Sequence, residues 1–219
     1  MFKAVLFDFD YTLGNSEQGI FLSVNHGLKE LGYAPQDLPV IKKTIGLSLK
    51  DTYITLTGDT NEEKAKKFSA LFIEKANEVM VKNTELYDGV LEVLHSLNNR
   101  SIKIGIVTTK LNLRIQQILT KFEIPHLVDV IIGAEDVQNP KPSPEGIEKA
   151  LKILGLAKAE ILYVGDSITD AKAAERAGVN FAGVLTGATD KDDLNNHKNL
   201  IIAKNITEIY NFFDRENLI

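Results

Sequence analysis

Six short apolar runs are spaced along the chain, and most of them are continuously apolar rather than alternating with polar residues. Runs of this kind predict strands that are covered on both faces, as in a parallel sheet. The expected strands are residues 4–7, 102–107, 128–132, 161–164, 181–185 and 200–202.

Helical patterns lie between these runs. Val90, Val93, Leu94 and Leu97 form an apolar stripe at helical spacing. Ser143 and Pro144 have the character of an N-cap and first helical residue, and Gly155 and Gly178 each close a helical segment. Helices that alternate with buried strands predict the α/β class, with a Rossmann-like parallel sheet.

Residues 16–85 interrupt this alternation because they contain helical patterns only. Thr60 followed by Glu63 predicts a capping box at the start of one of these helices. We therefore expect an α/β core domain formed by residues 1–15 and 86–219, with an inserted α-helical domain at residues 16–85. The boundaries are inferred from periodicity alone, since composition does not change at either end.

Composition narrows the range of functions. The 219 residues carry a net charge of -5 without a basic stripe, which argues against nucleic-acid and membrane-surface partners. Cysteine is absent, so thiolate chemistry and disulfides are excluded. The N-terminus shows no leader pattern and no apolar run approaches membrane-spanning length, which predicts a cytoplasmic protein. No protein partner is implied.

Polar side chains follow the predicted strands at the points where they end. In open α/β sheets, ligands bind at the carboxyl ends of the strands, so these residues are expected to share one crevice. The candidates are Asp8, Asp10, Thr108, Thr109, Lys141, Asp166, Ser167 and Asp170. Lys110, Glu135 and Asp136 also follow predicted strands.

This set of residue types suits phosphoryl transfer. Asp8, Asp10 and Asp166 would repel one another unless a cation lay among them, and hard oxygen ligands favour Mg²⁺. Lys141 then supplies a compact positive charge for phosphate oxygens, and the Thr108 hydroxyl supplies a hydrogen bond. Asp8 is the candidate nucleophile and Asp10 the candidate general acid and base. Each motif alone has an ordinary explanation: a solvated acidic pair, a loop lysine, or a helix cap at Ser167. Their joint occurrence is far more specific.

The segments "DFDYTL", "VTTK", "PKPSPE" and "GDSITD" resemble the four motifs of the haloacid dehalogenase (HAD) superfamily, in its phosphoglycolate phosphatase-like branch with a small helical cap. The resemblance implies a magnesium-dependent hydrolase that forms an aspartyl-phosphate. By position, Asp8 is the nucleophile, and Asp10 is the acid/base, whose main-chain carbonyl also binds the metal. Thr108 and Lys141 hold the phosphoryl group, Asp166 is a direct metal ligand, and Asp170 supports the metal site from behind. Asp10 favours a phosphatase over a dehalogenase.

Two residues depart from the family pattern. Tyr11 stands where glycine is usual, and Asn15 where aspartate is frequent. We expect the Tyr11 ring to lie on the loop surface rather than to contact substrate. Gly46 and Ser48 are weak candidates for specificity positions, because helix-turn packing explains them better. Residues 46–52 lack the second glycine and the Gly-Lys-Ser/Thr ending of an ATPase P-loop, and the four histidines lack zinc-ligand spacing.

The sequence thus predicts a magnesium-dependent phosphatase that hydrolyses a small phosphate monoester such as phosphoglycolate. Pyrophosphatase, nucleotidase and phosphomutase activities remain open, because each would use the same site. A non-catalytic binding or regulatory protein is the alternative from another class.

Overall fold

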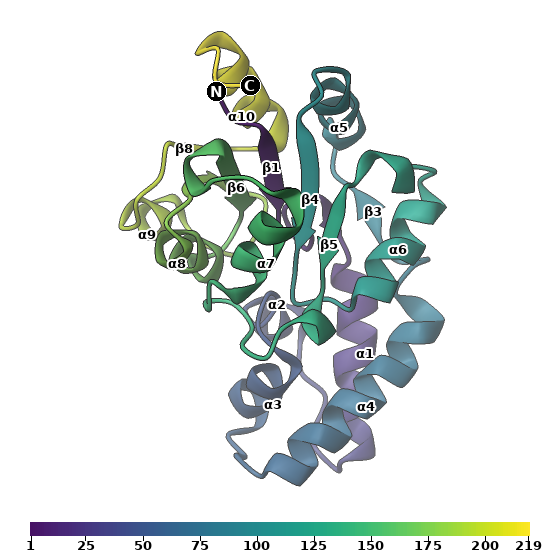
Figure 1. The fold of residues 1–219 in the computed structure, drawn as a ribbon. Coiled ribbons are helices and arrows are strands. Elements are labelled where there is room, and N and C mark those ends of the chain that lie inside the picture. Colours follow the sequence, from purple (N-terminus) through teal and green to yellow (C-terminus); the bar gives the residue numbers. More distant parts are fainter. The chain divides into compact units, whose positions relative to one another are not determined.

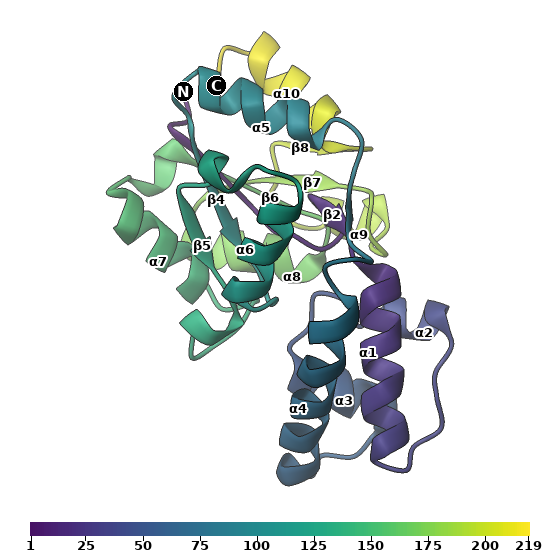
Figure 2. The ribbon, with the colours of Figure 1, turned by 90° about the vertical axis from the view of Figure 1, so that its right-hand side faces the viewer.

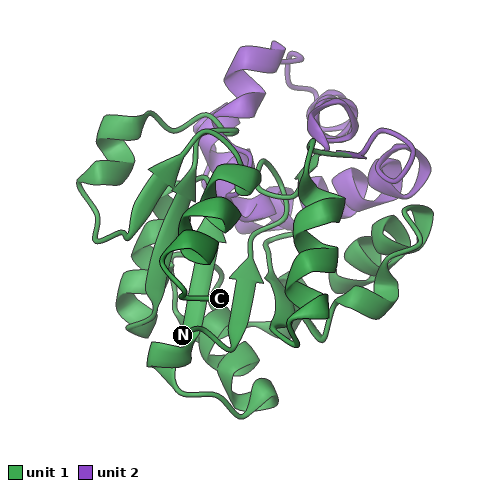
Figure 3. Ribbon diagram, turned by 90° about the horizontal axis from the view of Figure 1, so that it is seen from above, with its two compact units in different colours: residues 1–15, 86–219 green, residues 16–85 purple.

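The computed structural model describes residues 1–219 and divides into two compact units. Unit 1 consists of Met1–Asn15 and Leu86–Ile219, and unit 2 of Ser16–Glu85 (Figure 3). Two short strands, β2 (Gly14–Asn15) and β3 (Glu85–Leu86), pair where the chain leaves unit 1 and returns to it.

Unit 1 is built on a parallel six-stranded sheet, as the apolar runs predict (Figure 1). The strand order is β5-β4-β1-β6-β7-β8, so β1 pairs with β4 on one side and β6 on the other. The strands are β1 (Ala4–Phe7), β4 (Lys103–Val107), β5 (Val130–Ile132), β6 (Ile161–Gly165), β7 (Asn180–Val184) and β8 (Ile201–Ala203).

Helices cover both faces of this sheet (Figures 1 and 2). Successive side chains of a strand point to opposite faces, and all four side chains of β1 are buried. Ala4 and Leu6 pack in the core cluster that includes α7 and α8 residues, whereas Val5 and Phe7 face α5 and α10. The helices of unit 1 are α5 (Val90–Asn99), α6 (Asn112–Lys121), α7 (Glu145–Leu154), α8 (Ile168–Ala177), α9 (Lys191–Asn195) and α10 (Ile206–Arg215).

The predicted C-terminal ends of α7 and α8 are confirmed. Gly155 and Gly178 have φ of 67° and 74°, a left-handed conformation that glycine adopts at little cost. The start of α7 differs by one residue, because the helix begins at Glu145 and the Ser143 hydroxyl accepts the Glu145 N–H at 3.3 Å.

Unit 2 is helical, with α1 (Glu17–Glu30), α2 (Leu38–Lys42), α3 (Leu49–Thr57) and α4 (Glu62–Val79). Its own core includes Val24, Tyr53 and Phe68, which are fully buried. The expected cap at Thr60 is wrong: Asn61 is the N-cap of α4, and its side chain accepts the Lys64 N–H at 3.0 Å. Ser48 caps α3 in the same way, which supports the packing explanation for that residue.

None of the helices has the length and apolar character that crossing a bilayer requires.

Candidate active site

Three neighbouring strands at the centre of the unit 1 sheet end in polar residues. Asp8 directly follows β1, and its N–H still donates to the Val164 carbonyl at 2.9 Å, so strand pairing extends to this position. Thr108 follows β4, and Asp166 follows β6. Because β4, β1 and β6 are adjacent and parallel, their carboxyl ends bring these residues to one edge of the sheet.

Lys141 lies at the centre of the resulting charge cluster, although it comes from the loop between β5 and α7. Its Nζ lies 2.8 Å from Asp8 Oδ1 and 2.6 Å from Asp170 Oδ1, and donates to the Tyr163 hydroxyl at 3.2 Å. The three donors of the ammonium group thus face three acceptors. All four side chains are buried. Removing one partner of a buried pair typically costs about 3–5 kcal/mol, so these contacts fix the position of Lys141 firmly.

Asp170 is bound by protein groups at both of its oxygens. Oδ1 faces Lys141 and accepts from Tyr163 at 2.9 Å, while Oδ2 accepts from the Ser167 hydroxyl at 2.6 Å and the Ser167 N–H at 3.2 Å. The Ser167 side chain in turn accepts the Asp170 N–H at 3.1 Å, which completes a capping box at the start of α8. The same two residues therefore begin the helix and hold Lys141 in place.

Asp166 is enclosed by two other loops. Thr12 Oγ1 donates to Asp166 Oδ1 at 3.4 Å. The loop after β7 approaches so closely that a Cβ added to Gly187 would lie 1.8 Å from Asp166 Oδ2. The Thr186 hydroxyl donates to the Tyr11 carbonyl, which ties this loop to the turn after β1.

Asp10 contacts Lys110, which follows a predicted strand but has no role predicted from the sequence. Its Oδ2 lies 2.9 Å from Lys110 Nζ, and the two side chains are only 10% and 8% exposed. The other carboxylate oxygen, Oδ1, is buried without a hydrogen-bond partner. Asp10 therefore has one oxygen held by a cation and one that no protein group holds.

Thr108, Thr109 and Lys141 border one small cavity of about 10 Å³, which is room for a single water molecule. The Thr108 N–H donates to the Ile132 carbonyl at 3.0 Å, and its hydroxyl accepts the Lys110 N–H at 3.2 Å. Thr108 is buried and Thr109 is half-buried.

The electrostatics of the cluster favour an added positive charge. Burial raises the pKa of Asp8 to about 7, against the attraction of Lys141. Burial also raises the pKa of Asp166 well above its usual range, and the charges of Asp170 and Asp8 add to the effect. Burial alone would lower the pKa of Lys141, but Asp170 and Asp8 outweigh it and leave that pKa well above its usual range.

Oxygens of Asp8, Asp166 and Asp170 lie within 4.8 Å of one another. Three buried carboxylates near a single ammonium group leave negative charge uncompensated, and carboxylate oxygens are the ligands that hard divalent cations prefer. The residues present therefore fit a divalent metal ion.

The structure brings all the predicted site residues to this edge of unit 1, and it adds others. Tyr163 was not expected because it lies inside an apolar run, where an aromatic residue signals a buried strand. Thr12 and Gly187 gave no signal except their position next to a motif or close after a strand, and Lys110 was placed at the strand end without a role. One expectation is wrong: Tyr11 is 3% exposed, so its ring is not on the loop surface, and its φ is 61°, the conformation for which glycine is usual.

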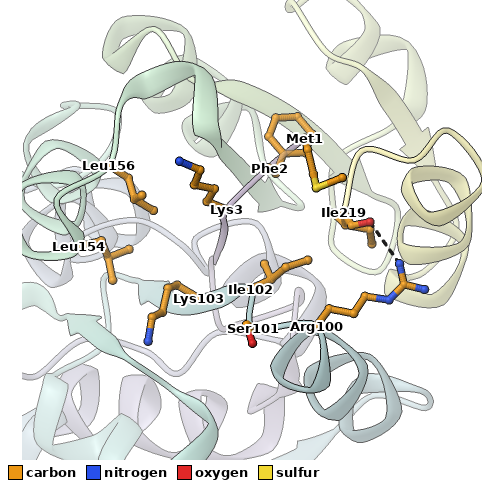
Figure 4. Close-up of a pocket in the computed structure, with 10 residues that line it drawn as sticks. All are labelled: Met1, Phe2, Lys3, Arg100, Ser101, Ile102, Lys103, Leu154, Leu156 and Ile219. Carbon is orange, nitrogen blue, oxygen red and sulfur yellow. Dashed lines mark hydrogen bonds between the residues drawn. The ribbon is translucent and has the colours of Figure 1, made fainter.

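A separate pocket of about 610 Å³ lies at the opposite edge of the sheet, beside the starts of β1 and β4 (Figure 4). Its cationic side chains are already neutralised: Lys3 pairs with Glu160, Lys103 with Asp129 and Arg100 with Asp214. Arg100 also donates to the Ile219 carbonyl at 3.1 Å, as Figure 4 shows. This pocket therefore lacks the reactive groups that the carboxyl edge collects.

Known proteins resemble the chain over most of its length. A family model described as haloacid dehalogenase-like hydrolase matches residues 5–184. A pyrophosphatase PpaX from Bacillus pumilus is 32% identical over 207 residues, which cover 94% of either protein. A phosphoglycolate phosphatase from Colwellia psychrerythraea is 29% identical over 202 residues, or 89% of either protein. A candidate haloacid dehalogenase-like hydrolase from Bacteroides fragilis has a solved structure that matches with a TM-score of 0.93 at 35% identity, covering 95% of this chain and 100% of that one.

Proposed function

Since the chain belongs to the haloacid dehalogenase-like hydrolase family and is a phosphatase of that family, we propose that it hydrolyses a small phosphate monoester. The proposed reaction passes through an aspartyl-phosphate on Asp8 and requires Mg²⁺. The proposal rests on one buried cluster. In it, Lys141 Nζ lies 2.8 Å from Asp8 Oδ1, and oxygens of Asp8, Asp166 and Asp170 lie within 4.8 Å of one another.

In the proposed reaction, Asp8 attacks the phosphorus atom and forms an acyl-phosphate bond as the bond to the ester oxygen breaks. Lys141 and the Thr108 hydroxyl bind the phosphoryl oxygens, with Thr109 beside them. Asp10 gives its proton to the leaving ester oxygen. A water molecule then attacks the phosphorus of the aspartyl-phosphate, its proton passes to Asp10, and inorganic phosphate and the Asp8 carboxylate are released.

Asp8, Asp166 and the main-chain carbonyl of Asp10 would hold Mg²⁺, with Ser167 and Asp170 supporting the site from behind. When bound, the ion neutralises charge on the carboxylates and on the phosphoryl group, which lets the two anions approach each other. Asp170 suits a supporting role because protein donors already occupy both of its oxygens.

Phosphoglycolate is the first candidate substrate, by analogy with the Colwellia relative. Inorganic pyrophosphate is the second, by analogy with the Bacillus pumilus pyrophosphatase, which is 32% identical. Both present a doubly ionised phosphoryl group to Lys141. A metabolite panel that also contains nucleoside monophosphates and sugar phosphates would decide between them through the kcat/KM of each compound.

The covalent step has a direct test in Asp8→Asn. We expect a fall in phosphate release of at least about 10⁴-fold on every active substrate, because an amide cannot form the acyl-phosphate. Phosphate release is measured with and without Mg²⁺, and EDTA should abolish it in the wild type. Asp129→Asn is the matched control, since Asp129 pairs with Lys103 at the other end of β4.

A fully active Asp8→Asn variant would contradict the covalent mechanism. If the wild type releases no phosphate from any monoester or from pyrophosphate, the protein is a binding module rather than a phosphatase. If it returns the phosphoryl group to the same sugar, it is a mutase.

A further inference from the structure

Lys110 and Asp10 form an ion pair that the predicted roles of the site residues leave without a function. Lys110 lies three residues beyond β4 and is 8% exposed, and its Nζ lies 2.9 Å from Asp10 Oδ2. Lysine is rarely buried to this degree unless a partner compensates its charge, so the pair is a fixed part of the site.

The backbone on either side of Lys110 is also held. Its N–H donates to the Thr108 hydroxyl at 3.2 Å, and its carbonyl accepts the Ala134 N–H at 3.0 Å. The side chain therefore starts from a fixed point and reaches Asp10 from the neighbouring strand end. A long side chain with both ends anchored has little freedom left to lose when substrate binds.

The effect on Asp10 is to distinguish its two oxygens. A partial rotation about the Cβ–Cγ bond would break the contact with Lys110, so the ammonium group fixes the plane of the carboxylate, with Oδ2 toward Lys110 and Oδ1 away from it. Oδ1 is left buried with no protein partner. A buried carboxylate oxygen without a partner is costly, and it persists here because Lys110 fixes the other oxygen.

We propose that Lys110 is the positioning residue for Asp10. Lys110 holds the Asp10 carboxylate so that Oδ1 gives the proton to the leaving oxygen and later takes one from water. The inference rests on the proposed function, since it assigns a device within the same reaction. Lys110 itself need not touch the substrate.

This role predicts a dependence on the leaving group. An alkyl phosphate such as phosphoglycolate expels a strongly basic alkoxide, which needs a proton as the bond breaks. p-Nitrophenyl phosphate expels a weakly basic phenolate that leaves without one. A small displacement of a catalytic group lowers the rate by on the order of 10²-fold. Because only the alkyl ester needs the proton from Asp10, the rate should fall mainly for that ester.

The experiment measures kcat/KM for both esters on the same preparation of Lys110→Met. We use kcat/KM because it reports the steps up to formation of the aspartyl-phosphate, where Asp10 acts as the acid. We expect a loss of about 10²-fold for the alkyl ester and less than about tenfold for the aryl ester. Lys110→Arg should recover most of the difference, because a guanidinium group can hold the same oxygen.

A matched control comes from the other end of the same strand. Lys103 begins β4 and pairs with Asp129 at 2.7 Å, but it is far more exposed. Lys103→Met should leave the ratio of the two kcat/KM values unchanged. Because this ratio does not depend on the fraction of protein that is folded, it remains informative even if Lys110→Met is partly unfolded.

An equal loss for the two esters would overturn the inference and would make Lys110 a general contributor to folding or phosphate binding. That result leaves the proposed function intact as long as the wild type hydrolyses both esters. A wild type that hydrolyses neither would overturn the proposed function, and with it the role of Lys110.

Discussion

Gly187 shows how tightly one backbone position constrains the candidate metal site. A Cβ at this position would lie 1.8 Å from Asp166 Oδ2 and 2.7 Å from its Cγ, so any side chain must displace the carboxylate. We expect Gly187→Ala to weaken Mg²⁺ binding by about 10–100-fold, the range found when groups around metal ligands are changed. Calorimetric titration of Mg²⁺ into the wild type and the variant measures this without reference to activity.

A suitable control is Gly58→Ala in unit 2. Gly58 has a positive φ of 69°, which Gly187 does not, and an added Cβ there meets nothing within 4 Å. That variant carries the backbone strain of a glycine replacement without the contact, and its Mg²⁺ affinity should be unchanged. Equal affinities for Gly187→Ala and the wild type would mean that Asp166 does not hold the metal.

At the scale of single residues, the sequence locates the candidate side chains better than it predicts the contacts around them. Asp8 and Thr108 can be found because each follows an apolar run directly, and Asp166 because it follows one after a single glycine. Tyr163 cannot be found in this way, because its hydroxyl contacts Lys141 only once β6 pairs with β1 in the folded sheet. Tyr11 is a failure of another kind: a bulky residue at a left-handed turn position gives no sign in the sequence that it is buried.

At the scale of elements, the start of α7 holds the loop that carries Lys141. The Glu145 carboxylate pairs with Lys149 at 2.9 Å and accepts the N–H groups of Gln138 and Asn139 at 3.0 and 2.9 Å. The hydrogen bond from Lys149, with those from the two backbone groups, lowers the pKa of Glu145 from 4.5 to about 2. One side chain therefore ties the loop to the first turn of the helix.

This lowered pKa gives a defined pH dependence. A carboxyl group with a lower pKa in the folded state stabilises the protein above its unfolded pKa, and the stabilisation is lost as pH falls through its folded pKa. Glu145→Gln should therefore be less stable than the wild type at pH 6, and the difference should shrink between pH 4.5 and about 2. Urea unfolding of both proteins across this range gives the difference, and a constant gap would contradict the assignment.

Element identity follows from the sequence more closely than element ends do. The run at 128–132 is one strand, but only Val130–Ile132 form it, because residues 125–127 make a 3₁₀ turn that leads into it. Thr60 and Asn61 are both good N-cap residues, and the second is the one that caps α4. Such choices between adjacent residues depend on tertiary contacts that periodicity does not contain.

At the scale of the whole molecule, the fold buries a group of mutually repelling carboxylates, which lowers the free energy of unfolding. Unit 1 buries Asp8, Asp166 and Asp170 together, with Lys141 as the ammonium group among them. Burial and mutual repulsion raise the pKa values of Asp8 and Asp166, which means that their ionised forms are disfavoured in the folded protein. Burying these carboxylates lowers the stability of the folded protein in favour of function, and a bound cation should restore that stability.

Magnesium should therefore stabilise the protein, and Asp166→Asn should separate the two effects. At a free Mg²⁺ concentration of 100 times Kd, binding to the folded state alone adds about 2.7 kcal/mol, or roughly 5–10 °C in Tm for a chain of this size. Asp166→Asn removes one of the repelling charges, so without metal at pH 8 we expect a higher Tm than the wild type, and with Mg²⁺ no further rise. Calorimetric scans of both proteins with EDTA and with Mg²⁺ measure all four values. If the variant is less stable without metal and still gains stability from Mg²⁺, the buried aspartates are held by contacts within the protein rather than by the ion.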